Sequence, residues 1–135
     1  MAEPVFNGKT ALVTGSTSGI GFAIAKSLLD QGYFVFLNGR DSKKGEQVLD
    51  ELQGKFGQLE LIVADVTTES GVTALVDQVK AKGEPIDLLV TNVGSGRCSN
   101  ELTVVQAEYQ QVMEVNFYSA VNVCNALIDH VKSPG

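Results

Sequence analysis

The feature that most constrains the fold of this chain is the alternation of four short apolar runs with longer segments of helical periodicity. The runs cover residues 11–13, 35–37, 61–63 and 86–90. They are apolar on both faces, as are parallel strands that helices cover on each side. Between them, apolar residues recur three and four positions apart, as on one face of a helix. This order predicts an α/β fold with a doubly wound parallel sheet, ending after the fourth strand and the helix that follows it.

Single residues indicate where the predicted helices begin and which faces they bury. One face of the first helix is defined by three apolar residues, Ile20, Ile24 and Leu28. Ser42 is the predicted N-cap of the second helix, because a serine side chain can accept a hydrogen bond from the first helical turn. A long helical stretch follows from about residue 104 to 131, and it can break near residues 110–113. Its predicted apolar stripe consists of Met113, Phe117, Ala120, Cys124, Leu127 and Val131.

Composition fits one domain over residues 1–135 and excludes several classes of function. With 44% hydrophobic and 19% charged residues, the chain has enough apolar material for a core. Its net charge of −6 has the wrong sign for nucleic acid or an anionic membrane, so neither partner is expected. Cys98 and Cys124 form no C-x-x-C pair, which argues against a metal site or a disulfide framework. The sequence shows no leader peptide and no run of ~18 apolar residues, so we expect a cytoplasmic protein.

A glycine-rich segment, TGSTSGIG at residues 14–21, lies between the first predicted strand and the first helix. Glycines allow a tight turn there and let backbone N–H groups approach a pyrophosphate, which the positive end of the helix also attracts. The segment is not a P-loop, because no Gly-Lys-Ser/Thr follows. The alternative is that these glycines serve packing alone. The site interpretation predicts a Rossmann-like dinucleotide fold with cofactor contacts from seven consecutive residues: Gly15, Ser16, Thr17, Ser18, Gly19, Ile20 and Gly21.

The segment at residues 14–21 resembles the cofactor motif of the short-chain dehydrogenase/reductase family. In that family an acid after the third strand lies against the adenine, and Asp65 with Val66 matches it. A helix asparagine holds a water in the family's proton relay, and Asn116 matches this residue. The resemblance extends over residues 8–132 and implies an NAD(P)-dependent oxidoreductase that acts on the carbonyl or alcohol of a small molecule.

A further part of the resemblance lies at the end of the fourth predicted strand. The family has Asn-Asn-Ala-Gly beside the cofactor there, where this chain has Thr91, Asn92, Val93 and Gly94. Thr91 and Val93 depart from the family pattern. The resemblance still implies that Asn92, Val93 and Gly94 line the cofactor.

The end of the second predicted strand indicates which dinucleotide would bind. Gly39 occupies the place of the acid that binds the ribose 2′-OH in NAD-specific relatives. Arg40 follows it with a guanidinium suited to a 2′-phosphate, and Asn38 precedes it as a further predicted cofactor residue. Asp41 opposes this reading, because it could pair with Arg40 or repel the phosphate. We expect NADP, with NAD as the alternative.

The catalytic residues that the resemblance implies have no counterpart in the chain. Tyr33, Tyr109 and Tyr118 are not followed by lysine four residues later, and no family serine is present. We therefore expect the N-terminal, NADP(H)-binding part of such an oxidoreductase, inactive alone, with Asn116 as its one relay residue. The alternative is a non-catalytic dinucleotide-binding or oligomerisation module. A fourth strand with a free edge and a helix with an uncovered face also predict a homo-oligomer.

Overall fold

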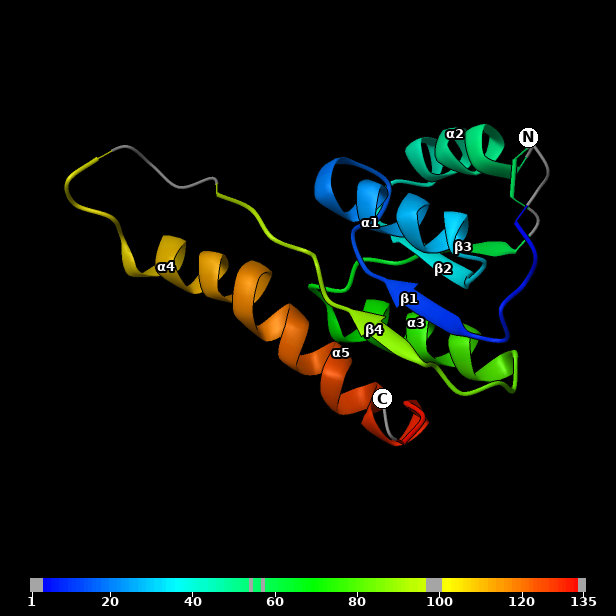
Figure 1. Ribbon diagram of the computed structural model, residues 1–135. Helices are drawn as coiled ribbons and strands as arrows, with labels where there is room; N and C mark the ends of the chain where they lie inside the picture. The colour runs from blue at the N-terminus through cyan, green and yellow to red at the C-terminus, as the bar shows by residue number, and fades with distance from the viewer. Residues whose placement is uncertain (1–3, 54, 57, 97–100, 134–135) are drawn as a thin grey trace.

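A four-stranded parallel sheet forms the centre of the computed structural model, which describes residues 4–53, 55–56, 58–96 and 101–133. The strands are β1 (Thr10–Val13), β2 (Phe34–Gly39), β3 (Leu59–Val63) and β4 (Leu88–Val90). Their spatial order is β3-β2-β1-β4, and every neighbouring pair is parallel (Figure 1). The predicted α/β fold with a Rossmann-like parallel sheet is confirmed.

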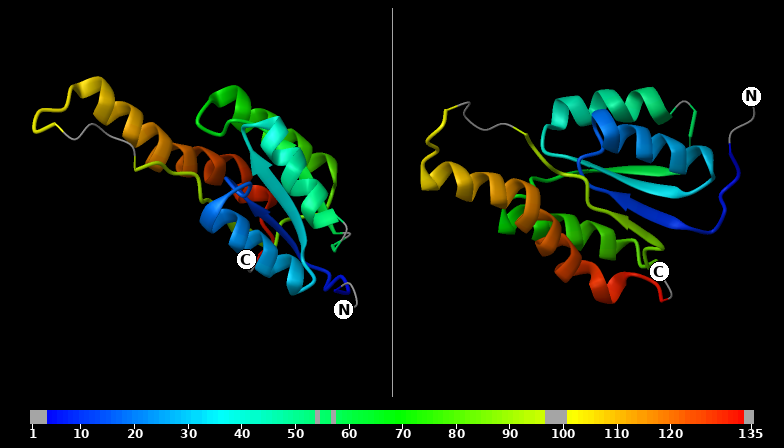
Figure 2. Two further views of the ribbon diagram at one scale, coloured as in Figure 1. Left: turned by 90° about the horizontal axis from the view of Figure 1, so that it is seen from above. Right: turned by 60° about the vertical axis from the view of Figure 1, so that its left-hand side comes forward.

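Helices cover both faces of this sheet. The first three are α1 (Gly19–Asp30), α2 (Ser42–Gln53) and α3 (Glu69–Ala81). The last stretch comprises α4 (Gln106–Met113), the π-helical segment η1 (Glu114–Tyr118), α5 (Ser119–Leu127) and the 3₁₀ segment η2 (Ile128–His130). Helices α1 and α2 lie on one face, and α3 and α5 lie on the other (Figure 2). Among the described residues, no helix combines the length and apolar character that a membrane crossing requires.

The core is divided into two layers because side chains alternate across each strand. In β1, Ala11 and Val13 point toward α1 and α2, whereas Leu12 points toward α3 and α5. Phe36 is fully buried on the same side as Leu12, and its ring meets that of Phe34 edge-to-face at a centroid distance of 5.1 Å. Both faces of the central strands are therefore buried, as their continuous apolar runs predicted.

Two local predictions about the first helices are wrong in detail. On the predicted face of α1, Leu28 is buried and Ile24 packs against the core, but Ile20 is 75% exposed. Ala25 and Leu29 complete the buried face. Ser42 is the first helical residue rather than the cap, and Asp41 takes that role: its carboxylate accepts a hydrogen bond from Lys44 N at 3.2 Å. An acid before the first turn stabilises the positive end of a helix as well as an orphan N–H group.

The apolar stripe predicted for the last helical stretch is buried only in part. Leu127 packs into the core as predicted, but Met113 and Phe117 are 47% and 52% exposed, and Val123, outside the predicted stripe, is buried as well. The predicted break appears as η1, just after the expected residues 110–113. A π-helical turn changes the direction in which following side chains point, and α4 extends beyond the sheet, where no element covers it (Figure 1).

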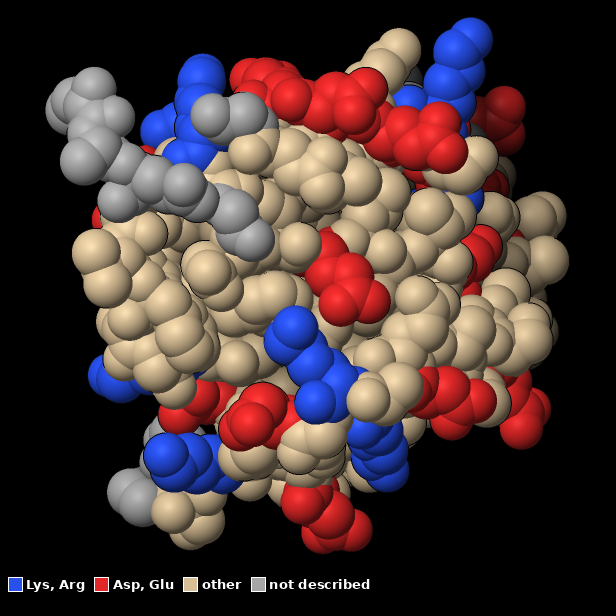
Figure 3. Space-filling model, turned by 90° about the vertical axis from the view of Figure 1, so that its right-hand side faces the viewer, with Lys and Arg blue, Asp and Glu red and all other residues tan. Residues whose placement is uncertain are grey.

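Beyond η2, the chain runs beside the outer edge of the sheet. Val131 forms an isolated parallel bridge with Ile86, just before β4. Ile86 N donates to His130 O at 3.0 Å, and Lys132 N donates to Ile86 O at 2.7 Å. On the side of the molecule where the strands begin, acidic and basic side chains surround a broad uncharged area (Figure 3).

Candidate functional site

A cavity of about 1290 Å³ opens at the carboxyl ends of the strands. It lies where the strand order reverses, since the chain moves from β1 to β2 and β3 on one side and to β4 on the other. Open α/β sheets bind their ligands at such a reversal. The cavity is bordered by the turn after β1, the ends of β2 and β3, the segment after β4, and the helix formed by α4 and η1.

The turn after β1 can hold an anion because of its glycines and the helix that follows. Gly15 and Gly19 have φ values of 60° and 57°, a left-handed conformation that favours glycine. Helix α1 has no acidic residue in its first turn, and the side chain of its N-cap, Ser18, makes no capping hydrogen bond. The positive end of α1 therefore faces the cavity with no acidic side chain in its own first turn to compensate it.

Gly21 allows the helix to approach the turn closely. A Cβ atom at this position would lie 2.3 Å from Gly15 O and 2.5 Å from Asn92 Nδ2. Asn92 Nδ2 donates to Gly15 O at 3.1 Å, and Asn92 N donates to Thr14 Oγ1 at 3.0 Å. The end of β4 is thus bonded to the glycine turn, and Gly21 keeps the space for that bond free.

The segment after β3 forms a compact turn at the rim of the cavity. Asp65 Oδ1 accepts hydrogen bonds from Thr67 N at 3.0 Å and from Thr67 Oγ1 at 2.6 Å. Thr68 caps α3 by accepting from Gly71 N at 3.0 Å, and its hydroxyl donates to Asp65 O at 2.8 Å. Asp65 and the buried Val66 line the cavity in this fixed conformation.

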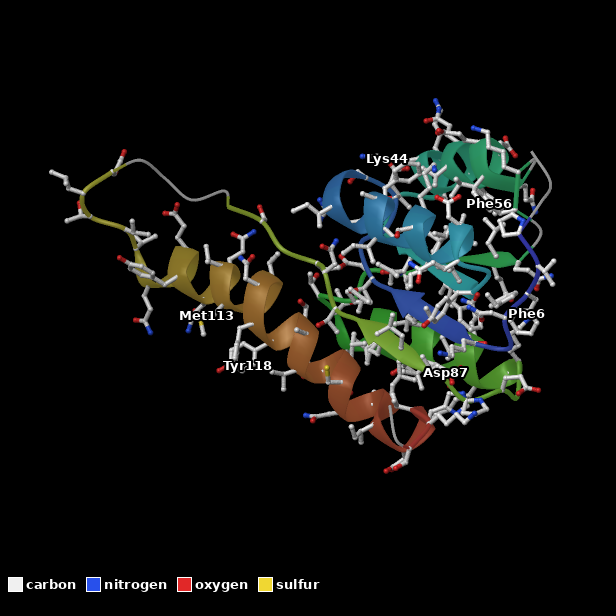
Figure 4. The ribbon with its side chains drawn as sticks, in the orientation of Figure 1. Phe6, Lys44, Phe56, Asp87, Met113 and Tyr118 are labelled. Atoms are coloured by element: carbon white, nitrogen blue, oxygen red, sulfur yellow. The ribbon has the colours of Figure 1, made fainter. Side chains whose placement is uncertain are left out.

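Basic groups gather at the end of β2. Arg40 is exposed and lines the cavity, and Lys44 lines it from the amino end of α2, beside the turn before α1 (Figure 4). In the part of the chain that the structure describes, no ion pair joins Arg40 to Asp41. A Cβ at Gly39 would lie 2.6 Å from Thr17 Cγ2, so a larger residue does not fit at that position without movement of Thr17.

Asn116 lies in η1 and joins the helix to the segment after β4. Its Oδ1 accepts from Ser95 N at 2.9 Å, and its Nδ2 donates to Ser95 O at 2.9 Å and to Val112 O at 3.0 Å. A Cβ at Gly94 would lie 2.8 Å from Asn116 Oδ1. Only a residue without a side chain therefore fits at position 94 in this arrangement.

The structure brings most of the predicted site residues to one cavity. Those that line it are Gly15, Thr17, Ser18, Gly19, Ile20, Asn38, Arg40, Asp65, Val66, Asn92, Val93, Gly94 and Asn116. Ser16 and Gly21 are buried behind the turn and support it. Sequence reasoning missed further lining residues: Ala64, Thr67, Ser95, Glu108, Gln111, Val112, Glu114 and Val115. Val112 lies four residues before Asn116 on the same helical face, and this spacing was the available signal.

Other reactive side chains lie outside the cavity. Tyr33, Tyr109 and Tyr118 do not line it. Within the described ranges, no group of three or more His, Cys, Asp or Glu side chains could hold a metal ion.

Comparison with protein families and curated proteins gives consistent matches. The short chain dehydrogenase family model matches residues 9–135. The uncharacterized oxidoreductase YvrD of Bacillus subtilis (strain 168) is 39% identical over 113 residues, covering 84% of this chain and 42% of the relative. The 3-oxoacyl-[acyl-carrier-protein] reductase FabG of Chlamydia trachomatis is 36% identical over 123 residues, covering 89% of this chain and 49% of that enzyme. The chain spans about half the length of these curated relatives.

Solved structures with the same fold include reductases. L-sorbose reductase from Gluconobacter frateurii, complexed with NADPH and L-sorbose, has a TM-score of 0.86 and 29% identity and is similar over 100% of this chain and 51% of its own. The RhlG/NADP active-site complex of Pseudomonas aeruginosa has a TM-score of 0.85 and 28% identity, over 96% of this chain and 51% of its own. Together with the glycine turn and the cavity at the strand ends, the match over residues 9–135 shows that the chain belongs to the short chain dehydrogenase family.

Proposed function

We propose that this chain binds NADP(H) in the cavity at the carboxyl ends of its strands. The observation that carries the proposal is the convergence there of the glycine turn and the amino end of α1, which has no acidic residue in its first turn. A positive helix end and a backbone turn suit a ligand that carries phosphates. The amino end of α2 lies at the same cavity, but the Asp41 carboxylate caps it. The surroundings of Gly21 support this fit, because a side chain there would close the approach of the helix to the turn.

Each part of the cofactor has a matching group of residues. The N–H groups of Ser18, Gly19 and Ile20 at the start of α1 would bind the pyrophosphate. Asp65 and Val66 would lie against the adenine, on the far side of β2. The segment after β4, with Val93 and its neighbours, would line the nicotinamide half.

Charge at the end of β2 favours NADP(H) over NAD(H). Arg40 and Lys44 both line the cavity, and among the described residues no acidic side chain forms an ion pair with Arg40. A guanidinium binds phosphate through two parallel hydrogen bonds. Gly39 offers no carboxylate to a ribose hydroxyl. NADPH and NADP are present in two of the similar structures described above.

We further propose that the whole protein is an oxidoreductase for the carbonyl or alcohol group of a small molecule. The bound nicotinamide would supply or accept the hydride. In this chain, Asn116 would contribute to the proton relay, and its side chain holds Ser95 in place beside the cavity. The residues that transfer the proton are not among those of this chain, which spans about half of its relatives.

The test is a titration of the full chain with NADPH and with NADH, in which binding is monitored by the fluorescence of the reduced nicotinamide. NADPH should bind more tightly than NADH. Arg40→Ala should weaken NADPH binding by about tenfold or more and leave NADH unchanged, because a hydrogen bond to a charged group contributes ~1.5–3 kcal/mol. Lys26→Ala, which removes an exposed positive charge from outside the cavity, is the matched control.

Two results would contradict the proposal at different levels. Equal losses of NADPH and NADH affinity in Arg40→Ala would remove the 2′-phosphate role of Arg40. Failure of the unmodified chain to bind either nucleotide would overturn the cofactor site itself.

A second candidate function is self-association without catalysis. It is favoured by the apolar side chains Met113, Phe117 and Tyr118, which are about half exposed. Met113 and Tyr118 lie on the side of the helix that faces away from the sheet (Figure 4). Sedimentation velocity of the full chain distinguishes a homo-oligomer from a monomer, and a purely monomeric chain would contradict this second function.

A further inference from the structure

The side chain of Asn38, the residue before the last of β2, lies inside the protein between three strand ends. Its Nδ2 donates one hydrogen bond to Ile62 O and one to Ala64 O, each at 3.1 Å. Its Oδ1 accepts from Gly15 N at 3.3 Å. Asn38 is 1% exposed, so both amide N–H groups and the amide oxygen are used within the protein.

The backbone of Asn38 is bonded to the glycine turn as well. Asn38 N donates to Ser16 Oγ at 2.9 Å, and Ser16 N donates to Asn38 O at 2.8 Å. Ser16 is fully buried. The turn is therefore attached to β2 through both the backbone and the side chain of one residue.

These bonds join the glycine turn to the segment after β3, which the strand pairing does not link directly. The paired residues of β1 and β2 end at Val13 and Leu37, and those of β2 and β3 end at Gly39 and Val63. Past these points, Ala64 N donates to Gly39 O at 3.0 Å, and the side chain of Asn38 joins Gly15 N to Ala64 O. Gly15 begins the turn assigned to the pyrophosphate, and Ala64 precedes Asp65, which is assigned to the adenine.

We infer that Asn38 is a positioning residue that sets the distance between the pyrophosphate turn and the adenine side of the NADP(H) site. This inference rests on the proposed function. The sequence predicts a direct cofactor contact for Asn38, whereas its hydrogen bonds turn the side chain into the protein. An amide is needed because the position requires two donors toward β3 and one acceptor toward the turn.

The deciding variant is Asn38→Asp, which has nearly the same shape but replaces the donor group with an oxygen. When ionised, that oxygen faces two carbonyl oxygens and repels them, so the adenine side of the cavity moves away from the turn. When protonated, the acid can donate one hydrogen bond and restore part of the connection. Burial among acceptors raises the pKa of this carboxyl, so the protonated form is the one present at low pH.

The experiment is calorimetric titration of the full chain with NADP⁺ at about pH 8 and about pH 5.5, on either side of the raised pKa. At each pH, the dissociation constant of the variant is divided by that of the unmodified chain, which removes the titration of the nucleotide. We expect a ratio of about ten or more at high pH and a clearly smaller ratio at low pH, where one of the two donated hydrogen bonds is restored. Asn125→Asp is the matched control, because it introduces the same carboxylate at an exposed position of α5. It should give a ratio near one at both pH values.

A second variant keeps the inference testable if circular dichroism shows that Asn38→Asp is unfolded. Ser16→Ala removes the hydroxyl that accepts from Asn38 N and leaves the amide bonds in place. It should weaken NADP⁺ binding severalfold with the fold retained, and unchanged affinity would overturn the inference. For Asn38→Asp, a ratio near one at both pH values, or an equal loss at both, would overturn it while leaving the proposed function intact. Absence of binding by the unmodified chain would overturn both.

Discussion

Replacing Gly21 by alanine tests whether the close approach of α1 to the glycine turn is what shapes the site. The added methyl carbon would lie 2.3 Å from Gly15 O and 2.5 Å from Asn92 Nδ2, in the space beside their 3.1 Å hydrogen bond. Both contacts are shorter than a carbon atom tolerates, and one of them is to a backbone atom. The helix and the turn must therefore separate, or the hydrogen bond must break.

The expected loss of stability follows from three contributions. Overpacking a well-filled site costs ~1–3 kcal/mol, and loss of one hydrogen bond costs ~0.5–1.5 kcal/mol. The better helix propensity of alanine offsets up to ~1 kcal/mol. The net loss is about 0.5–4.5 kcal/mol, which lowers the melting temperature of a domain of this size by roughly 2–16 °C.

Thermal unfolding and NADPH titration of the same sample provide the assay. Affinity for NADPH should fall by about tenfold or more, because a displaced turn no longer presents its N–H groups to the pyrophosphate. Gly96→Ala is the matched control, since a Cβ at that position meets nothing within 4 Å. If Gly21→Ala melts and binds like the unmodified chain, the close contact does not determine the shape of the turn.

Three further changes have different expected outcomes. Asp41→Asn keeps an acceptor for Lys44 N, so the melting temperature should stay the same. Because the change removes a negative charge beside Arg40, NADPH should bind severalfold more tightly at low ionic strength, and added salt should abolish this gain in affinity. Thr68→Ala removes the cap on Gly71 N and should lower the free energy of unfolding by ~1 kcal/mol in a urea titration, with unaltered stability contradicting the capping role. Phe117→Ser, at a side chain that is 52% exposed, should reduce self-association in sedimentation velocity with little change in melting; an unchanged sedimentation coefficient would exclude this surface as the contact.

Much of the fold could be predicted because its determinants are local in the chain. Four runs that are apolar on both faces predict strands, and the structure confirms all four. β1 and β2 are buried on both faces, whereas Glu60 and Val63 of β3 are exposed and β4 is half-buried. The glycine turn could also be located, since a strand, several glycines and an amphipathic segment follow one another directly. Residues 14–21 therefore carried information about both the turn and its position in the sheet.

The periodicity of apolar residues was a less reliable guide to which helix face is buried. It gives the spacing of these residues along the helix but not which element packs against them. Ile20 fits the apolar stripe of α1 yet lies at the cavity, 75% exposed. In the last helix, the π-helical turn at residues 114–118 rotates Val123 into the core and leaves Phe117 outside. A single extra residue in one helical turn is enough to change which face is buried. A prediction that assumes 3.6 residues in every turn does not allow for that extra residue.

The sequence by itself determined the order of strands and helices, the turn after β1 and the basic residue at the end of β2. Only the tertiary structure decided that Asn38 bonds Gly15, Ile62 and Ala64, and that Asn116 bonds Ser95. The partners of Asn38 lie 23 to 26 residues away along the chain. Such contacts arise because parallel strands bring their carboxyl ends to one edge, and a buried amide must find donors and acceptors there.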